Sequence, residues 1–145
     1  KFLLKSQLDY LGRYNPRLNS KISGWINWHN DSLKLYRFIN AFDEPYLGAR
    51  TTINNQEVYI KKAHLHSGDT CNHPFMTGLI SRHDQKWIVV STIDENMLLI
   101  ESILNSRGKN IISKLNPGDR FFTPNNKLEL ALSKKIIYSS KGIKK

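Results

Sequence analysis

The sequence predicts a mainly β domain, a small barrel or sandwich, with one amphipathic helix near its start. Between positions 51 and 104, short apolar runs recur at intervals of about ten residues, and turn residues such as Asn54-Asn55 separate them. Residues 31–43 show instead the period of an amphipathic helix. A chain of 145 residues is the usual size of one domain and buries roughly two-thirds of its unfolded surface, so we expect one compact core.

Residues 1–23 are expected to precede the domain. Residues 1–12 read as a short helix whose apolar side chains are Phe2, Leu3, Leu4, Leu8 and Leu11. Residues 13–23 contain Asn15-Pro16 and read as an extended linker that ends at Gly24. Because the chain begins with Lys1, we expect a fragment in which 1–23 is the tail of an upstream domain plus a linker, and 24–145 is the domain.

Residues 31–43 are predicted to form the helix. Its apolar face is made by residues spaced i, i+3, i+4 and i+7, which are Leu35, Phe38, Ile39 and Phe42. The opposite face carries Lys34, Arg37 and Asn40. Asn30, Asp31 and Ser32 are all competent N-caps, and Asp43-Glu44-Pro45 ends the helix because proline disfavours the α conformation of the preceding residue. Gly48 then allows a sharp turn, and Trp25 and Trp28 are expected to pack against the helix.

The strands follow in three groups. Residues 51–53 and 57–66 form a hairpin around Asn54-Asn55, a good tight-turn pair. Residues 75–82 and 87–92 form a second pair, and residues 97–104 add a further apolar strand. For residues 125–133, a helical turn and a strand both stay open.

The net charge of +10 is concentrated near the C-terminal end. Residues 107–145 contain ten Lys and Arg against two Asp and Glu, whereas residues 1–106 contain twelve against ten. Such a field attracts phosphates, so RNA, nucleotides or an acidic partner are candidates, while a plain solvated surface is the alternative. No apolar run has the roughly 20 residues of a membrane span and no signal-peptide pattern occurs, so a cytoplasmic protein is expected.

The commonest local motifs of nucleotide hydrolysis, metalloproteolysis and serine hydrolysis are absent from the sequence. It contains no phosphate-binding Gly-rich loop, no His-Glu-x-x-His and no Gly-x-Ser-x-Gly. Zinc accepts the side chains of His64, His66, Cys71 and His73, but their spacing matches no common zinc module, so we predict no metal site. Cys71 is the single cysteine, which excludes an internal disulfide.

Several segments resemble one family. The segment 24–49, GWINWHNDSLKLYRFINAFDEPYLGA, resembles the opening of the C-terminal domain of methionyl-tRNA formyltransferase and related formyltransferases. The segments 60–65 (IKKAHL), 73–75 (HPF) and 117–124 (PGDRFFTP) also resemble this family, so the likeness covers most of residues 13–143. This chain departs from the family pattern at three positions, which indicates a divergent member: Asn27, Asn40 and Leu47.

The resemblance implies an open Greek-key barrel similar to the oligonucleotide-binding (OB) fold, acting as a substrate-positioning accessory domain. In that family the catalytic Asn, His and Asp belong to an N-terminal domain that uses 10-formyltetrahydrofolate. Here His66-Ser67 continues into Gly68-Asp69, which does not match the catalytic motif, so no catalytic residue and no cofactor is expected in this chain.

The expected partners are an upstream catalytic domain and tRNA as the acceptor. Two alternatives stay open. One is the accessory domain of a sugar-nucleotide N-formyltransferase, and the other is a free-standing nucleic-acid-binding module.

Contact with RNA or phosphate requires exposed cationic groups. The candidates are Arg50, Lys61, Lys62, Arg107, Lys109, Lys134 and Lys135. Lys61 and Lys62 are adjacent on one strand and point to opposite faces, so we expect only one of them to face solvent.

Overall fold

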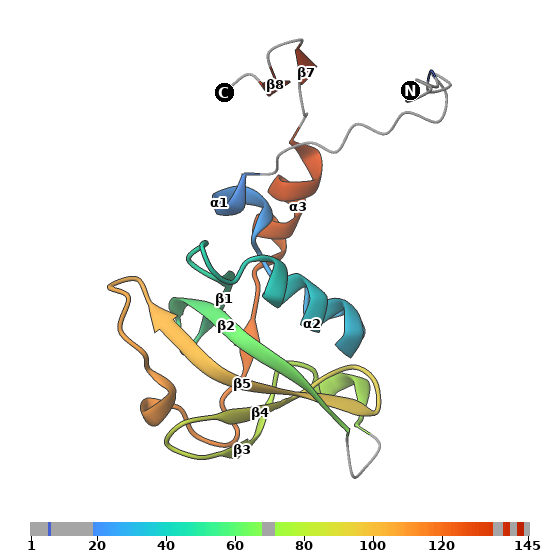
Figure 1. Cartoon of the computed structure of the whole chain (residues 1–145). Coiled ribbons are helices and arrows are strands. Elements are labelled where there is room, and N and C mark those ends of the chain that lie inside the picture. Colours follow the sequence, from blue (N-terminus) through green and yellow to red (C-terminus); the bar gives the residue numbers. More distant parts are fainter. Residues whose placement is uncertain (1–5, 7–18, 68–71, 135–137, 140–141, 144–145) are drawn as a thin grey trace, which may run out of the picture.

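A curled antiparallel sheet of six strands, in the order β3-β4-β5-β2-β1-β6, forms the body of the protein in a computed structural model (Figure 1). The structure describes residues 6, 19–67, 72–134, 138–139 and 142–143. The strands of the sheet are β1 (Ala49–Ile53), β2 (Gln56–Ser67), β3 (Ile80–His83), β4 (Ile88–Ser91), β5 (Asn96–Asn105) and β6 (Phe121–Phe122). The helical elements are α1 (Ser20–Ser23), α2 (Ser32–Ala41), η2 (Pro74–Met76), η3 (Ile112–Lys114) and α3 (Asn125–Ser133). A two-stranded ribbon is made by β7 (Tyr138–Ser139) and β8 (Gly142–Ile143).

The predicted mainly β small barrel with one amphipathic helix is therefore confirmed. Within the described residues, no helix has the length and the hydropathy needed to cross a bilayer.

The β1–β2 hairpin forms where the Asn-Asn pair predicted it. Asn54 and Asn55 both adopt positive φ, 49° and 61°, which a tight two-residue turn between antiparallel strands requires. The register pairs Ile53 with Gln56 and Ala49 with Ile60. The predicted hairpin is confirmed, and both strands are longer than expected.

The second strand pair is shorter than predicted. The ladder of this pair runs between β3 and β4, which are shorter than the predicted strands. Residues 74–76 form a 3-10 turn, so the prediction of a strand starting at 75 is wrong. Pro74 has no backbone N–H to donate to a ladder, and the His73 side chain accepts from the amide of Phe75, which favours the turn. The predicted strand at 97–104 is confirmed as β5.

The barrel is closed by the segment 118–122, which lies between the two edges of the sheet. On one side β6 pairs with β1, with Thr52 opposite Phe122. On the other side the amide of Phe121 donates to the oxygen of Gly78 at 2.8 Å, and the amide of Ile80 donates to the oxygen of Asp119 at 2.8 Å. Because Phe121 is buried, its neighbours in the chain are turned outward.

At the N-terminal end, the predicted helix at 1–12 lies outside the described residues except for Ser6. The predicted extended linker at 13–23 is wrong over its last part, because α1 makes one helical turn there. Asn19 caps this turn by accepting from the amide of Lys21 at 2.9 Å. The open alternative for residues 125–133 is resolved as a helix, and α1 packs against α3.

The amphipathic helix α2 begins and ends close to its predicted bounds. Asp31 is the N-cap, accepting from the amide of Lys34 at 2.8 Å. Leu35 and Ile39 are fully buried. Phe38 and Phe42 are half-buried against the same core, and the predicted polar residues Lys34, Arg37 and Asn40 are exposed.

Asp94, in the β4–β5 turn, joins the sheet to the start of α2. Its carboxylate accepts from the amide and hydroxyl of Ser32, at 2.8 and 2.9 Å, and from Thr92 Oγ1 and the amide of Asn96, both at 2.9 Å. Partial burial raises the pKa of Asp94, but these hydrogen bonds to the charged form outweigh burial and leave the pKa below its usual value.

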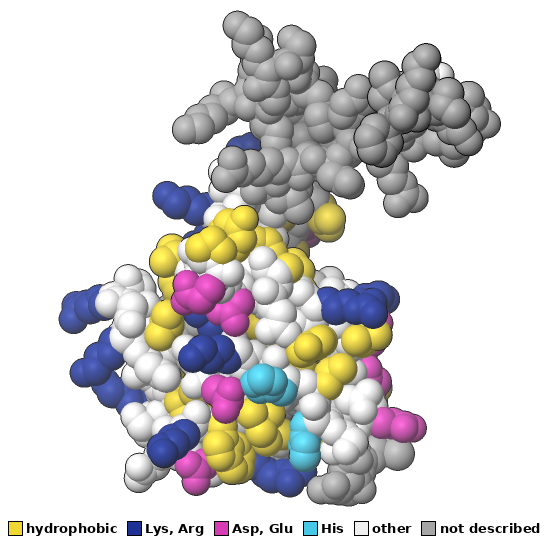
Figure 2. All heavy atoms as spheres, in the orientation of Figure 1, with side chains coloured by type: hydrophobic (Ala, Val, Ile, Leu, Met, Phe, Trp, Pro, Cys, Tyr) yellow, Lys and Arg dark blue, Asp and Glu magenta, His cyan; other side chains and the backbone are white. Residues whose placement is uncertain are grey.

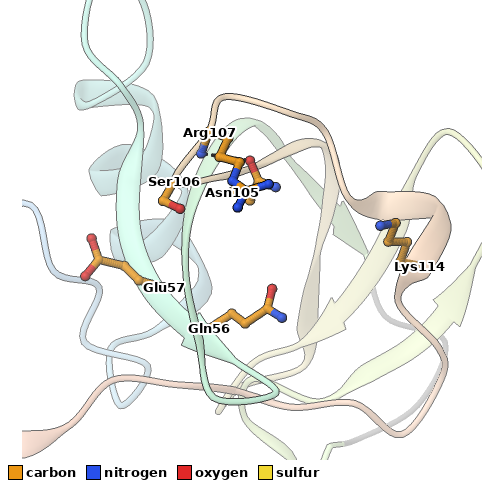
Figure 3. A pocket seen from close by; sticks show the side chains of 6 residues that line it. All are labelled: Gln56, Glu57, Asn105, Ser106, Arg107 and Lys114. Carbon is orange, nitrogen blue, oxygen red and sulfur yellow. Dashed lines mark hydrogen bonds between the residues drawn. The ribbon is translucent and has the colours of Figure 1, made fainter.

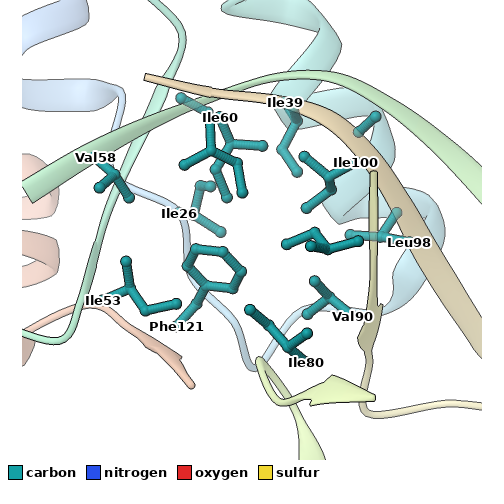
Figure 4. Packing of buried hydrophobic residues seen from close by; sticks show 14 of the residues in the cluster. Ile26, Ile39, Ile53, Val58, Ile60, Ile80, Val90, Leu98, Ile100 and Phe121 are labelled. Atoms are coloured by element: carbon teal, nitrogen blue, oxygen red, sulfur yellow. The ribbon is translucent and has the colours of Figure 1, made fainter. Parts of the chain in front are cut away.

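The core fills the space between the curled sheet and α2 (Figure 4). Side chains converge on it from both sides of the barrel, and those labelled in the view are Ile26, Ile39, Ile53, Val58, Ile60, Ile80, Val90, Leu98, Ile100 and Phe121. Trp28 joins this core by stacking on Phe121, with ring centroids 5.3 Å apart, while its indole N–H donates to Thr51 Oγ1 at 2.9 Å. Trp25 is also buried, and the guanidinium of Arg50 lies 4.4 Å from its ring centroid. Burial of both tryptophans is confirmed, and Trp28 shares the core with Leu35 and Ile39 of α2, as predicted, in addition to its contacts with the strands.

The long strands β2 and β5 change their inward-facing side halfway along. On β2, Ile60 and Ala63 are both buried although they are three residues apart, and β5 makes the same shift between Ile100 and Ile103. Lys62 adopts φ of 52° at this point, and the register is the same before and after it. The prediction that only one of the two adjacent lysines faces solvent is confirmed, since Lys62 is the exposed one.

Candidate nucleic-acid interface

Lys61 is held by the acidic turn that follows α2. Its ammonium lies 2.6 Å from Glu44 Oε1 and 4.0 Å from Asp43 Oδ1, and its side chain is only 9% exposed. The amide of Lys62 donates to Asp43 Oδ2 at 3.2 Å, so the turn binds both residues of the strand. A phosphate contact by Lys61 stays a prediction, but its charge is already paired, whereas the side chain of Lys62 is exposed.

Arg50 is fixed in a similar way. Its Nε donates to Glu57 Oε1 at 3.0 Å, and Nη2 reaches the same oxygen. The guanidinium lies over the ring of Trp25, and Nη1 donates to the backbone oxygen of Lys21. Tyr59 donates to Glu57 as well, and burial followed by this hydrogen bond raises the pKa of the tyrosine. Arg50 thus ties the start of the domain to the first hairpin, and its proposed RNA contact stays untested.

Arg107 and Lys109 lie on an ordered turn after β5. The side-chain oxygen of Asn105 accepts from the amides of both residues at 3.0 Å. The backbone of Asn105 closes the turn, donating to the oxygen of Lys109 at 3.0 Å and accepting from Gly108 at 2.9 Å. The two cationic side chains therefore project from a defined backbone.

A shallow hollow of about 460 Å³ lies between the start of β2 and the segment from 105 to 114 (Figure 3). It is lined by Gln56, Glu57, Asn105, Ser106, Arg107 and Lys114. A second hollow of about 170 Å³ shares Gln56, Asn105 and Lys114 with the first. Arg107 and Lys114 come from different segments of this lining, and Gln56 and Asn105 add carboxamide groups.

The cations of this hollow differ from Arg50 and Lys61 in their electrostatics. Within the described part of the chain, no carboxylate lies within 4.0 Å of Arg107, Lys109 or Lys114. Glu57 is the one acidic residue of the lining, and it is held by Arg50. Figure 2 shows Lys and Arg spread around the edge of one face, with acidic side chains between them.

The remaining candidates contribute less to this surface. Lys134 is exposed just after α3, and Lys135 lies outside the described residues. Lys114 was not among the predicted candidates. The sequence gives only a weak signal for a phosphate contact there, because a single lysine between apolar residues and a Pro-Gly turn has no distinctive spacing.

Two histidines of the considered metal cluster have other contacts. His64 Nε2 lies 3.0 Å from Glu101 Oε2, and both side chains are exposed. The ring of His73 stacks on that of Phe75. Over the residues that the structure describes, no group of three or more His, Cys, Asp or Glu is placed to hold a metal ion, and Cys71 lies outside them.

An exposed aromatic surface was missed from the sequence. Phe75 is 79% exposed and Phe122 is 59% exposed, although large apolar side chains are usually buried. Arg120 lies between them in the fold, since its Nη2 donates to the backbone oxygen of Phe75 at 2.6 Å. The only trace of this surface in the sequence was the His-Pro-Phe and Arg-Phe-Phe segments. Residue type alone does not predict that Phe75 and Phe122 are exposed.

A curled six-stranded sheet closed by a returning segment, with one amphipathic helix on its core, defines a small β-barrel domain. Comparison with known protein families agrees with this class. The family described as formyl transferase, C-terminal domain, matches residues 19–119, which is more than half of the chain, so the chain belongs to this family. No curated protein matches the chain.

Proposed function

We propose that this domain holds the acceptor of formyl transfer, a tRNA, against a separate catalytic domain, and that it contributes no catalytic group. The observation that carries the proposal is the hollow between β2 and the segment 105–114, which is lined by the cations Arg107 and Lys114 together with the amides of Gln56 and Asn105. Cations without a carboxylate partner suit phosphate oxygens, and side-chain amides suit sugar and base edges.

The same hollow does not fit the folate donor. None of its six lining residues is apolar, whereas cofactor sites are lined mainly by apolar and aromatic side chains. In this proposal, 10-formyltetrahydrofolate and the residues that perform the chemistry belong to the catalytic domain.

The salt dependence of tRNA binding tests the proposal. Contacts from Arg107, Lys109 and Lys114 to three phosphates lower log affinity by about 2 to 3 for each tenfold rise in salt. Arg107→Gln and Lys114→Gln should each weaken binding and reduce this slope by about one. Lys34→Gln is the matched control, because Lys34 is exposed on α2 and already pairs with Asp31 at 3.0 Å.

Absence of tRNA binding at low salt would refute the acceptor role. Binding that the two glutamine variants leave unchanged would move the contact to another surface. Saturable binding of a nucleotide-sugar without tRNA binding would support the alternative of a sugar-nucleotide N-formyltransferase.

A further inference from the structure

We infer that the exposed aromatic surface made by His73, Phe75, Arg120 and Phe122 binds an unstacked base of a single-stranded RNA segment. This inference rests on the proposed function and extends it, since the phosphate contacts described above do not distinguish paired from unpaired RNA. It also assigns a role to the most exposed aromatic side chain among the described residues.

The first support is the geometry of Phe75. Its ring stacks on His73 with centroids 5.0 Å apart and planes 19° apart, so His73 covers one ring face. With 79% of the residue exposed, the other face is open to solvent. The amide of Phe75 donates to His73 Nδ1 at 3.3 Å, and Pro74 restricts the backbone between them, so the pair is held in place. A rigid open ring face is what base stacking requires, because stacking is strongest when little side-chain freedom is lost.

The second support is the position of Arg120. Its guanidinium is fixed by the 2.6 Å hydrogen bond to the backbone oxygen of Phe75, which places a positive charge beside the aromatic pair. Across the described chain, no carboxylate lies within 4.0 Å of this guanidinium, so its charge is available to a phosphate. Arginine also stacks on bases through its plane.

The third support is Phe122, which extends the surface along β6. Phe121 lies between Arg120 and Phe122 in the chain and points into the core, so its two neighbours point outward. Side chains two residues apart on a strand lie roughly 6.5 Å from each other. Aromatic faces combined with cationic groups are the elements of single-strand binding surfaces. An apolar protein partner would not need the unpaired guanidinium at the centre of its contact.

The experiment measures binding of the whole chain to a single-stranded RNA of about eight nucleotides that carries 2-aminopurine, with a duplex RNA of equal length as comparison. The expected results are quenching of 2-aminopurine on binding and a preference for the single strand. Phe75→Ala should weaken this binding by about tenfold without changing the salt slope, because a stacking contact and no phosphate contact is lost. Phe75→Tyr keeps the ring and should stay within about twofold of the wild type.

Two further variants separate the contributions. Arg120→Gln should lower the salt slope by about one, in contrast to Phe75→Ala. Tyr46→Ala is the control, because Tyr46 is an exposed aromatic residue of the turn after α2 and lies outside this surface. The exposure of Phe75 also means that its substitution should leave the urea midpoint unchanged, which excludes unfolding as the cause of weaker binding.

Four outcomes decide the inference. Single-strand binding and quenching that Phe75→Ala does not affect would overturn it, as would equal affinity for the duplex, and Phe75 would then suit a protein contact. If tRNA binds but single-stranded RNA does not, the inference fails and the acceptor role stands. If single-stranded RNA binds through Phe75 but tRNA does not bind, base stacking stands and the acceptor role fails.

Discussion

Closure of the barrel depends on the close approach of Gly78 to Phe121, and Gly78→Ala tests it. Gly78 has φ of 79°, and a Cβ placed there would lie 2.5 Å from the backbone oxygen of Phe121. Because that oxygen is backbone, one of the two segments must move. The amide of Phe121 donates to Gly78 at 2.8 Å, and the amide of Gly78 donates to Ser91 at 2.9 Å, so the movement affects at least one of these hydrogen bonds.

The expected loss of stability follows from these contacts. Alanine in the left-handed region costs roughly 1 to 2 kcal/mol, and each disturbed hydrogen bond adds about 1 kcal/mol. Gly78→Ala should therefore lower the free energy of unfolding by about 2 to 4 kcal/mol. Gly108→Ala is the matched control, since its φ is 73° but no heavy atom lies within 4 Å of the added Cβ. It should cost only the conformational part, about 1 to 2 kcal/mol.

Urea unfolding of the two variants and the wild type measures the difference, provided that the m-values agree. Both glycines have positive φ, so the comparison isolates the close contact at Gly78. If the two variants lose the same stability within about 0.5 kcal/mol, the tight closure is refuted. The same substitution should also move Arg120 and Phe122, so its effect on RNA binding would follow its effect on folding.

Three further predictions concern the helix and its links to the sheet. Leu35→Ala should lower the free energy of unfolding by about 2 to 5 kcal/mol, and Phe38→Ala should lower it by less, because Leu35 is fully buried and Phe38 is only half-buried. An equal loss for the two variants in urea unfolding would contradict this order. Glu44→Gln should lower the free energy of unfolding by less than about 1 kcal/mol, because the Glu44 side chain is 78% exposed and water screens its ion pair with Lys61. A loss above about 2 kcal/mol in the same assay would contradict this screening. The depressed pKa of Asp94 contributes stability that is present above its ordinary pKa of 3.8 and is lost as the pH falls through the lower folded value. Asp94→Asn should therefore weaken the dependence of the urea midpoint on pH in this acidic range, and an unchanged profile would contradict this role.

The elements that could be predicted are those with local causes. The N-cap Asp31 and the apolar period of α2 lie within one helix, and Asn54-Asn55 determine their own turn, so each signal is contained in a short window. The start of β3 had a local signal as well, because Pro74 argued against a strand there. Closure by Phe121 had none, since the residues that meet are more than forty positions apart and no period connects them.

The candidate site divides in the same way. Arg107 and Lys109 were candidates because of their charge, and the structure places them on a turn ordered by Asn105. Pairing of Arg50 with Glu57 was accessible from the predicted hairpin, because a register fixed at Asn54-Asn55 brings these two strands into contact. The exposure of Phe75 was not accessible, because an apolar residue in a strand-like run is read as buried unless the tertiary packing is known.

Packing of α1 against α3 brings the start and the end of the described domain to one place, as the upper part of Figure 1 shows. A domain with neighbouring ends is attached to its surroundings at a single point, which is the arrangement that tolerates circular permutation and insertion into other chains. A permutant that joins residue 134 to residue 19 through a short flexible linker and opens the chain elsewhere should therefore keep the barrel. Such a molecule would let the surfaces proposed to bind RNA be studied with the attachment point removed.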